Sequence, residues 1–261
     1  MSNALARLRD ALGDPLLVRA GRGLVPTPRA LQLAPAVSRA LAELQRGLDD
    51  GSFDAQTTTR ELTIALTDAD QLATLPKIAR RFVEVMPAAR LRAVSIDTLL
   101  ATGGLSGEVD LALGIGEYPG VRMQPLYEVA GVFVVARDHP RVKRRLTRRL
   151  FERERHVDVL VAGGRPGWGN KMVEDALARK GMQRQVAIAV PTFVAAVMVA
   201  AETELVAGVP RGVAESLNVP VKIVTPPFGQ PNWVLNMMWH ERTEHDPAAK
   251  CLREIVASVF C

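Results

Sequence analysis

The sequence predicts an α/β protein with two α/β units in tandem, preceded by a short basic N-terminal segment. From residue 61 onward, apolar runs of strand length alternate with amphipathic stretches of helix length. A polar, turn-rich segment over residues 49–59 separates this alternation from the opening of the chain. Strands that alternate with helical patterns are typical of sheets joined by crossover helices. A chain of 261 residues with 48% hydrophobic residues can bury the cores that such a fold needs.

The N-terminal segment is expected to hold a helix, a hairpin and a second helix. Apolar residues on one face predict a helix over residues 2–12, which Gly13 ends. Short apolar runs on either side of residues 20–23 predict the hairpin, with Arg22 at its tip. Between residues 28 and 48, apolar residues follow the spacing of a helix that packs lengthwise on another: Ala34, Val37, Leu41, Leu44 and Leu48. Pro35 is expected to interrupt the first turns of this helix.

The remaining strands and helices are predicted from apolar runs of strand length and from apolar residues at helical spacing. Strands are expected at 61–67, 90–95, 109–115, 132–136, 156–161, 185–190, 205–209, 221–224 and 232–240. Helices are expected at 71–86, 97–103, 170–180, 192–201 and 247–259.

Charge is distributed unevenly along the chain. Residues 1–46 carry seven Arg against three acidic residues, so a polyanion is a reasonable partner for this segment. A second basic run over residues 137–155 is interpreted as a solvated amphipathic helix.

Cysteine usage and hydropathy exclude several protein classes. The two cysteines lie ten residues apart near the C-terminus and indicate neither a disulfide framework nor a metal site. The N-terminus has no hydrophobic signal core, and the longest apolar stretch, residues 193–201, is too short for a membrane span. We therefore expect a cytoplasmic protein without a membrane partner.

The opening of the chain resembles the LysR-type family of transcriptional regulators. The residues that carry this likeness run SNALARLRDALGDPLLVRAGRGLVPTPRALQLAPAV, and the likeness continues through ELTIALTD, GEVDLALG, VFVVARDHP and VPTFVAAVMVAAETELVAGVPRGVAE. The resemblance implies a DNA-binding regulator that responds to a small-molecule effector.

The resemblance also implies how the chain is divided into domains. Residues 1–27 would be a partial winged helix-turn-helix, residues 28–58 a linker and dimerisation helix with a hinge, and residues 59–261 the effector-binding domain. That domain would hold two Rossmann-like subdomains, like a type 2 periplasmic binding protein. Residues 59–136 and 227–261 would form subdomain I, and residues 137–226 subdomain II. A homodimer or homotetramer is expected.

The chain departs from the family at its start. Family members carry further helices before the recognition helix, whereas Met1 here falls at or inside that helix. A recognition helix without its bracing helix is expected to fray and to bind DNA weakly. Either the start was assigned at an internal Met or the form is truncated. The alternative function is a solute sensor or a dominant-negative partner that does not bind DNA.

Candidate DNA contacts lie in the first helix and the hairpin. Ser2, Asn3 and Arg7 suit base edges or phosphates, since short polar groups and Arg serve groove readout. Arg22 suits a phosphate or a narrow minor groove. Arg19 is a further candidate, with local packing as its alternative role.

Candidate effector contacts lie where helices begin after strands. Free backbone N–H groups and the positive end of the helix dipole collect anions there, so a small organic or aromatic acid is the expected effector. The candidates are Thr67, Asp68, Thr98, Gly167, Trp168, Thr192 and Phe193. Asp97 and Thr192 are equally good N-caps in any protein, and Trp168 either gates the cleft or covers a helix.

Catalytic and metal patterns are weak, so no enzyme activity, cofactor or metal is expected. Residues 164–169 have the glycine spacing of a phosphate loop, but Asn170 stands where that loop requires lysine. His240 and His245 lie near the exit of a predicted strand rather than on one helical face, so they need not converge on a metal.

Overall fold

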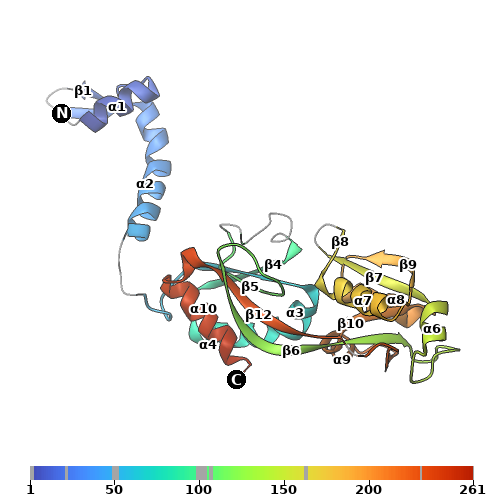
Figure 1. Cartoon of the computed structure of the whole chain (residues 1–261). Coiled ribbons are helices and arrows are strands. Elements are labelled where there is room, and N and C mark those ends of the chain that lie inside the picture. Colours follow the sequence, from blue (N-terminus) through green and yellow to red (C-terminus); the bar gives the residue numbers. More distant parts are fainter. Residues whose placement is uncertain are drawn as a thin grey trace. The chain divides into compact units, whose positions relative to one another are not determined.

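The computed structural model describes residues 3–20, 23–48, 53–97, 105, 108–161, 164–229 and 231–260. The chain forms two compact units, Met1–Ser52 and Phe53–Cys261, which Figure 1 shows in the colours of the sequence. Within the described residues, no helix is long and apolar enough to cross a membrane.

The first unit contains helix α1 (Asn3–Leu12), strands β1 (Leu17–Ala20) and β2 (Gly23–Pro26), and helix α2 (Pro28–Leu48). The two strands pair antiparallel, as expected for the hairpin. Asp14 holds the hairpin to the start of α2, because its carboxylate accepts hydrogen bonds from Leu16 N at 2.7 Å and Thr27 Oγ1 at 2.8 Å. Thr27 Oγ1 in turn accepts from Ala30 N at 3.1 Å, which caps α2.

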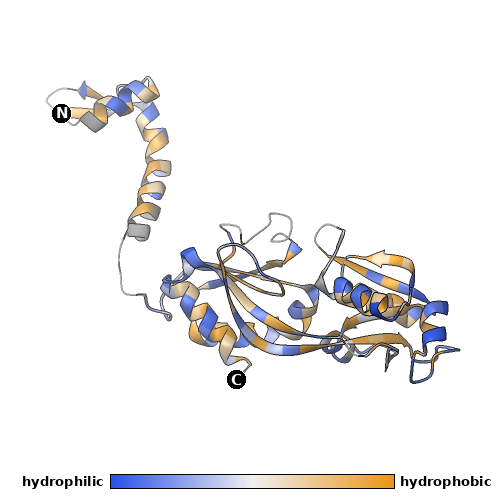
Figure 2. Cartoon of the chain, in the orientation of Figure 1, coloured by the Kyte–Doolittle hydropathy of each residue, from blue (hydrophilic) through white to orange (hydrophobic). Residues whose placement is uncertain are grey.

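Helix α2 runs unbroken through Pro35, contrary to the expected early interruption. Proline removes one backbone donor from a helix, and the other hydrogen bonds of this long helix maintain it. Several of its apolar side chains are exposed, including Leu31, Val37, Leu41 and Leu44. Figure 2 shows hydrophobic residues along this helix. A helix with such a face gains most of its stability from packing on another surface.

The second unit is an α/β structure. Its strands are β3 (Glu61–Leu66), β4 (Arg90–Ser95), β5 (Leu111–Gly114), β6 (Val121–Ala136), β7 (Arg155–Val161), β8 (Arg165–Pro166), β9 (Gln185–Val190), β10 (Val206–Pro210), β11 (Val221–Val224) and β12 (Asn232–His240). Its helices are α3 (Asp68–Ala73), α4 (Leu75–Val85), α6 (Arg148–Arg153), α7 (Trp168–Arg179), α8 (Phe193–Glu202), α9 (Arg211–Ser216), the short 3₁₀ helix η1 (Glu241–Thr243) and α10 (Pro247–Ser258).

These strands form one mixed sheet in the order β4-β3-β5-β12-β6-β10-β7-β8, with β11 on β6 and β9 on β7. Strand β6 pairs with β12 over its first part and with β10 and β11 over its last. We call the strands from β4 to β12 the first half of the sheet and those from β10 to β8, with β11 and β9, the second half. Strand β6 belongs to both halves.

Each half has its own apolar core. Helices α4 and α10 pack on the first half, where Ile64, Phe82 and Leu252 are buried together. Helix α8 covers one face of the second half around Val134 and Val197. Helices α6 and α7 cover its other face.

Strand β6 and the helix that follows β3 differ from the sequence-based expectations. Strand β6 begins at Val121, eleven residues before the predicted start, because Pro125, Glu128 and Gly131 break the apolar pattern that was used to find it. The helix predicted over 71–86 is two helices, α3 and α4, that meet at Thr74, with Pro76 in the first turn of the second. The first turn of a helix tolerates proline, because the N–H group that proline lacks would have no partner within the helix there.

The basic run over 137–155 was wrongly predicted as one amphipathic helix. Only Arg148–Arg153 is helical, and Val142 and Leu146 are fully buried in the loop before it. This loop is held by Arg141, which donates two hydrogen bonds of 2.7 Å to the Glu154 carboxylate. These hydrogen bonds lower the pKa of Glu154. The apolar spacing in this run therefore reflects loop burial as well as helix.

Part of the expected linker is ordered on the second unit. Phe53 and Ala55 pack against the core of the first half. Gln56 donates from Nε2 to the Val85 carbonyl at 3.1 Å. Residues 49–52 lie outside the described part of the chain.

Candidate functional site

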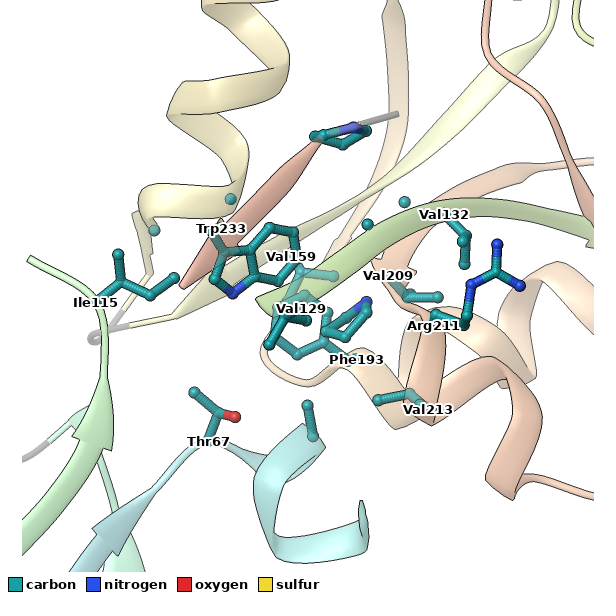
Figure 3. Close-up of a pocket in the computed structure, with 18 of the residues that line it drawn as sticks. Thr67, Ile115, Val129, Val132, Val159, Phe193, Val209, Arg211, Val213 and Trp233 are labelled. Carbon is teal, nitrogen blue, oxygen red and sulfur yellow. The ribbon is translucent and has the colours of Figure 1, made fainter. Parts of the chain in front are cut away.

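The second unit contains a pocket of about 550 Å³. Residues from both halves of the sheet line it, as the close-up in Figure 3 shows. They include residues from the residue after β3 and from helix α3, from the end of β5, from the middle of β6, from β7 and β10, from the start of β12, and from helices α7, α8 and α9. A ligand in this space would touch both halves at once.

Most of the pocket wall is apolar. Valines from three strands and from helices α7 and α9 line it, namely Val129, Val132, Val157, Val159, Val161, Val173, Val209 and Val213. Phe193 and Trp233 add aromatic surface from the start of α8 and from β12, and Figure 3 shows both rings at the pocket. Pockets of this size and composition are typical of small-molecule sites.

Two tyrosines add hydroxyl groups to this wall. Tyr118 and Tyr127 both line the pocket, and burial raises the pKa of each hydroxyl. The Tyr118 hydroxyl donates to the Ile115 carbonyl at 3.4 Å. Both tyrosines therefore stay neutral and offer polar contacts without charge.

Asp70 is a buried carboxylate on this wall. Its exposed fraction is 8%, and Thr67 Oγ1 donates to its Oδ2 at 2.6 Å. Burial raises the pKa of Asp70 to about 6, which the Thr67 hydrogen bond opposes and the nearby Asp68 reinforces. An ionisable group held in a pocket with a shifted pKa is a functional-site candidate.

Asp68 lies beside this carboxylate but serves helix α8. Its Oδ2 accepts from Val194 N at 2.9 Å, 126 positions along the chain. Burial raises the pKa of Asp68, and backbone hydrogen bonds from Val194 and Phe193 oppose that shift. Thr192 completes the cap, since its Oγ1 accepts from Ala195 N at 3.1 Å. Side chains of the protein thus occupy the first donors of α8.

Among the described residues that line the pocket, two are arginines, and each is paired with a carboxylate. Arg184 pairs with Asp158 at 3.1 Å and with Glu174 at 2.6 Å. Arg211 pairs with Glu215 at 3.1 Å, one helical turn away. Both guanidinium groups are therefore neutralised within the protein.

The structure brings three of the seven candidate effector residues to the pocket. Thr67, Gly167 and Phe193 line it. Asp68 and Thr192 instead hold the start of α8, and neither is among the described residues that line the pocket. Thr98 and the side chain of Trp168 lie outside the described part of the chain, although the backbone of Trp168 begins α7.

The candidate DNA contacts fall in the first unit. Arg7 on α1 and Arg19 on β1 are exposed. Asn3 is the first residue of α1, and its side chain is outside the described part. Ser2 and Arg22 also lie outside it.

Sequence reasoning missed most of the polar and aromatic lining. Asp70 lies in the observed helix α3, just before the start of the helix predicted over 71–86, and Tyr127 lies in the part of β6 that was not predicted. Trp233 is the second residue of strand β12, and its place near the start of a predicted strand was the one sequence signal that could have pointed to it. Most valines of the wall lie in strands that were predicted, but pocket and core use the same apolar side chains, so the sequence pattern did not single these valines out.

The fold and the pocket define this chain as a LysR-type regulatory domain joined to a basic helical segment. A family model described as "LysR substrate binding domain" matches residues 55–261, and the chain belongs to this family.

Relatives and solved structures agree with this assignment. The chain is 32% identical over 271 residues to the HTH-type transcriptional activator NagR of Ralstonia sp., covering 100% of this chain and 87% of that protein. It is 33% identical over 271 residues to the HTH-type transcriptional regulator SyrM of Rhizobium etli, covering 100% of this chain and 77% of that one. The crystal structure of the probable transcriptional regulator PA0477 from Pseudomonas aeruginosa matches with a TM-score of 0.73 and 33% identity, covering 98% of this chain and 85% of that one.

Proposed function

We propose that this protein is a transcriptional regulator whose pocket binds a small-molecule effector. The observation that carries the proposal is the position of the pocket, since both halves of the sheet line it. A ligand that touches both halves favours the arrangement in which both sets of contacts form, and so shifts the equilibrium between conformations. Residues 59–136 and 227–261 act as one subdomain, and residues 137–226 as the other.

The first unit is the proposed DNA-binding part. Arg7 and Arg19 are exposed there, and residues 1–46 carry an excess of arginine. Exposed guanidinium groups bind phosphate oxygens. Ser2, Asn3 and Arg22 are proposed as further contacts. The relatives named as transcriptional regulators support this role.

Helix α2 is the proposed dimerisation element. Its exposed apolar side chains, with Leu44 60% exposed, follow one face of the helix. Burying such a face against a second copy would remove it from water. A dimer would also bring two DNA-binding parts together.

Salt-dependent DNA binding tests the role of the first unit. The full chain is titrated into a labelled mixed-sequence duplex at several salt concentrations. Each lost phosphate contact reduces the magnitude of the slope of log affinity against log salt by about 0.9. The double variant Arg7→Glu and Arg19→Glu loses two proposed contacts, so its slope is expected to be smaller in magnitude by about 1.8. Arg149→Glu, an equal charge change at an exposed site of the second unit, is the control. Equal slopes for the wild type and the double variant would refute the proposed DNA contacts.

Ligand-induced stabilisation tests the pocket. Thermal unfolding of the full chain is measured against a panel of aromatic and aliphatic compounds. Val129→Trp fills the pocket and is expected to abolish any stabilisation seen in the wild type. Val234→Trp, at an exposed position on β12, is the matched control and should keep it. Stabilisation that survives Val129→Trp would place the effector elsewhere.

A further inference from the structure

We propose that the pocket selects an uncharged aromatic molecule that carries a hydroxyl group, and that the Asp70 carboxylate accepts the hydrogen bond of that hydroxyl. The inference rests on the proposed function and names the class of its effector. It replaces the organic or aromatic acid that the sequence led us to expect.

The charges on the pocket wall disfavour a carboxylate ligand. Among the described lining residues, the carboxylates are those of Asp70, Glu128, Asp158 and Glu215, and the guanidinium groups are those of Arg184 and Arg211. Both arginines already form salt bridges of 2.6–3.1 Å within the protein. A ligand carboxylate would lose its water and either break one of these pairs or stay unpaired, and both are costly.

The start of helix α8 independently disfavours a carboxylate ligand. The sequence led us to expect free N–H groups for an anion at this position. The Asp68 carboxylate accepts from Val194 N at 2.9 Å, and Thr192 Oγ1 accepts from Ala195 N at 3.1 Å. An internal carboxylate therefore takes the place that an anionic effector would have used.

The wall favours flat aromatic surface. Among the described lining residues, five contribute aromatic rings alongside the valines, namely Tyr118, Tyr127, Phe133, Phe193 and Trp233. Aromatic rings pack against each other in offset or edge-to-face geometry and bury large apolar areas. A volume of about 550 Å³ accommodates more than a single six-membered ring.

Asp70 supplies the polar recognition. One of its oxygens accepts a hydrogen bond from the Thr67 hydroxyl at 2.6 Å, and an ionised carboxylate can accept further hydrogen bonds. A ligand hydroxyl would form a charge-assisted hydrogen bond to it, which is stronger than a neutral one. A site built around such an acceptor rejects analogues that lack the donor. An ammonium group would lose far more hydration than a hydroxyl on entering this apolar space.

Four probes that share one scaffold test the class of ligand. They are 4-hydroxybiphenyl, biphenyl, biphenyl-4-carboxylate and biphenyl-4-ylmethylammonium, and binding to the full chain is measured by calorimetry at pH 7.5. The hydroxyl compound is expected to bind at least about ten-fold more tightly than biphenyl, as one charge-assisted hydrogen bond allows. The carboxylate and the ammonium compound are expected to bind more weakly than the hydroxyl compound.

Variants separate Asp70 from the rest of the pocket. Asp70→Leu is expected to abolish the preference for 4-hydroxybiphenyl over biphenyl while biphenyl still binds. Asp70→Asn keeps an acceptor oxygen and is expected to reduce that preference. Glu215→Gln removes a carboxylate that also lines the pocket but is exposed, and it is expected to keep the preference.

The outcomes distinguish this inference from the proposed function. Tighter binding of the carboxylate or of the ammonium compound, lost in Val129→Trp, would overturn the ligand class while the pocket remains the effector site. Unchanged selectivity in Asp70→Leu would overturn the role of Asp70. Binding that survives Val129→Trp would overturn the pocket itself, and no binding of any of the four probes would overturn the ligand class.

Discussion

Replacing Asp70 with asparagine is expected to stabilise the folded protein at neutral and alkaline pH. The carboxylate is buried against an apolar wall, so its charge is costly in the folded state. Asparagine has nearly the same shape, and its side-chain oxygen can still accept the hydrogen bond that Thr67 donates. The substitution therefore removes the charge and keeps the local geometry.

The magnitude follows from the pKa of Asp70. Folding raises this pKa from 3.8 to about 6, and one pKa unit corresponds to about 1.4 kcal/mol. The ionised group therefore costs the folded state about 3 kcal/mol above pH 6. Because the pKa is raised, the folded state takes up a proton as the pH falls through 6. The cost shrinks to about half at pH 5 and vanishes below the unfolded pKa.

Urea denaturation of the full chain at pH 8 and pH 5 checks this reasoning. Asp70→Asn is expected to raise the free energy of unfolding by up to about 3 kcal/mol at pH 8 and by about half as much at pH 5. Asp138→Asn, the same change at an exposed position, should stay within about 0.5 kcal/mol of the wild type. A variant less stable than the wild type at pH 8, or a gain that does not depend on pH, would refute the argument. A gain in stability would show that the wild type keeps this carboxylate at a cost, as binding sites often do.

Three further substitutions test the fold and the proposed dimer. Glu154→Gln removes a buried charge to which Arg141 donates two hydrogen bonds. We expect the free energy of unfolding to fall by about 2 kcal/mol at pH 7. Because the pKa of Glu154 is lowered, this loss is expected to shrink as the pH falls, and urea denaturation at several pH values measures the loss and its pH dependence. Gly131→Ala would place a Cβ 2.8 Å from Pro231 Cγ and 2.9 Å from its carbonyl oxygen, so a fall in melting temperature is expected and an unchanged one would contradict the described β6–β12 packing. Leu41→Glu puts a charge on the exposed face of α2 and is expected to weaken self-association of the full chain in sedimentation, whereas equal association would remove α2 from the dimer contact.

The order of helices and strands could be predicted from the sequence because helices and strands space their apolar residues differently, about every 3.6 residues and every second residue. Most strands and helices were expected within a few residues of their observed bounds. The errors fall where burial and periodicity disagree. Val142 and Leu146 are buried in a loop although the run around them is basic. Pro125 and Gly131 lie inside β6, before the start at residue 132 that the apolar pattern predicted.

The pocket was harder to predict for a physical reason. Sequence reasoning located helix starts after strands, and Thr67, Gly167 and Phe193 do line the pocket. It could not show that Asp68 would cap a helix 126 positions away, because that contact depends on how the two halves of the sheet meet. Asp70 was missed for the same reason, since its burial arises from packing between elements rather than from its own segment.

The position of β12 determines when the second unit can be completed during synthesis. This strand lies between β5 and β6, although some hundred residues separate it from the end of β6. A ribosome that has released the chain up to residue 220 has delivered β5 and β6, but their facing edges still lack the strand that joins them. Unpaired edges of this kind attract other strands. Completion of the sheet therefore depends on the final thirty residues. A chain shortened before Asn232 would leave the edges of β5 and β6 unpaired and prone to pair with strands of other molecules.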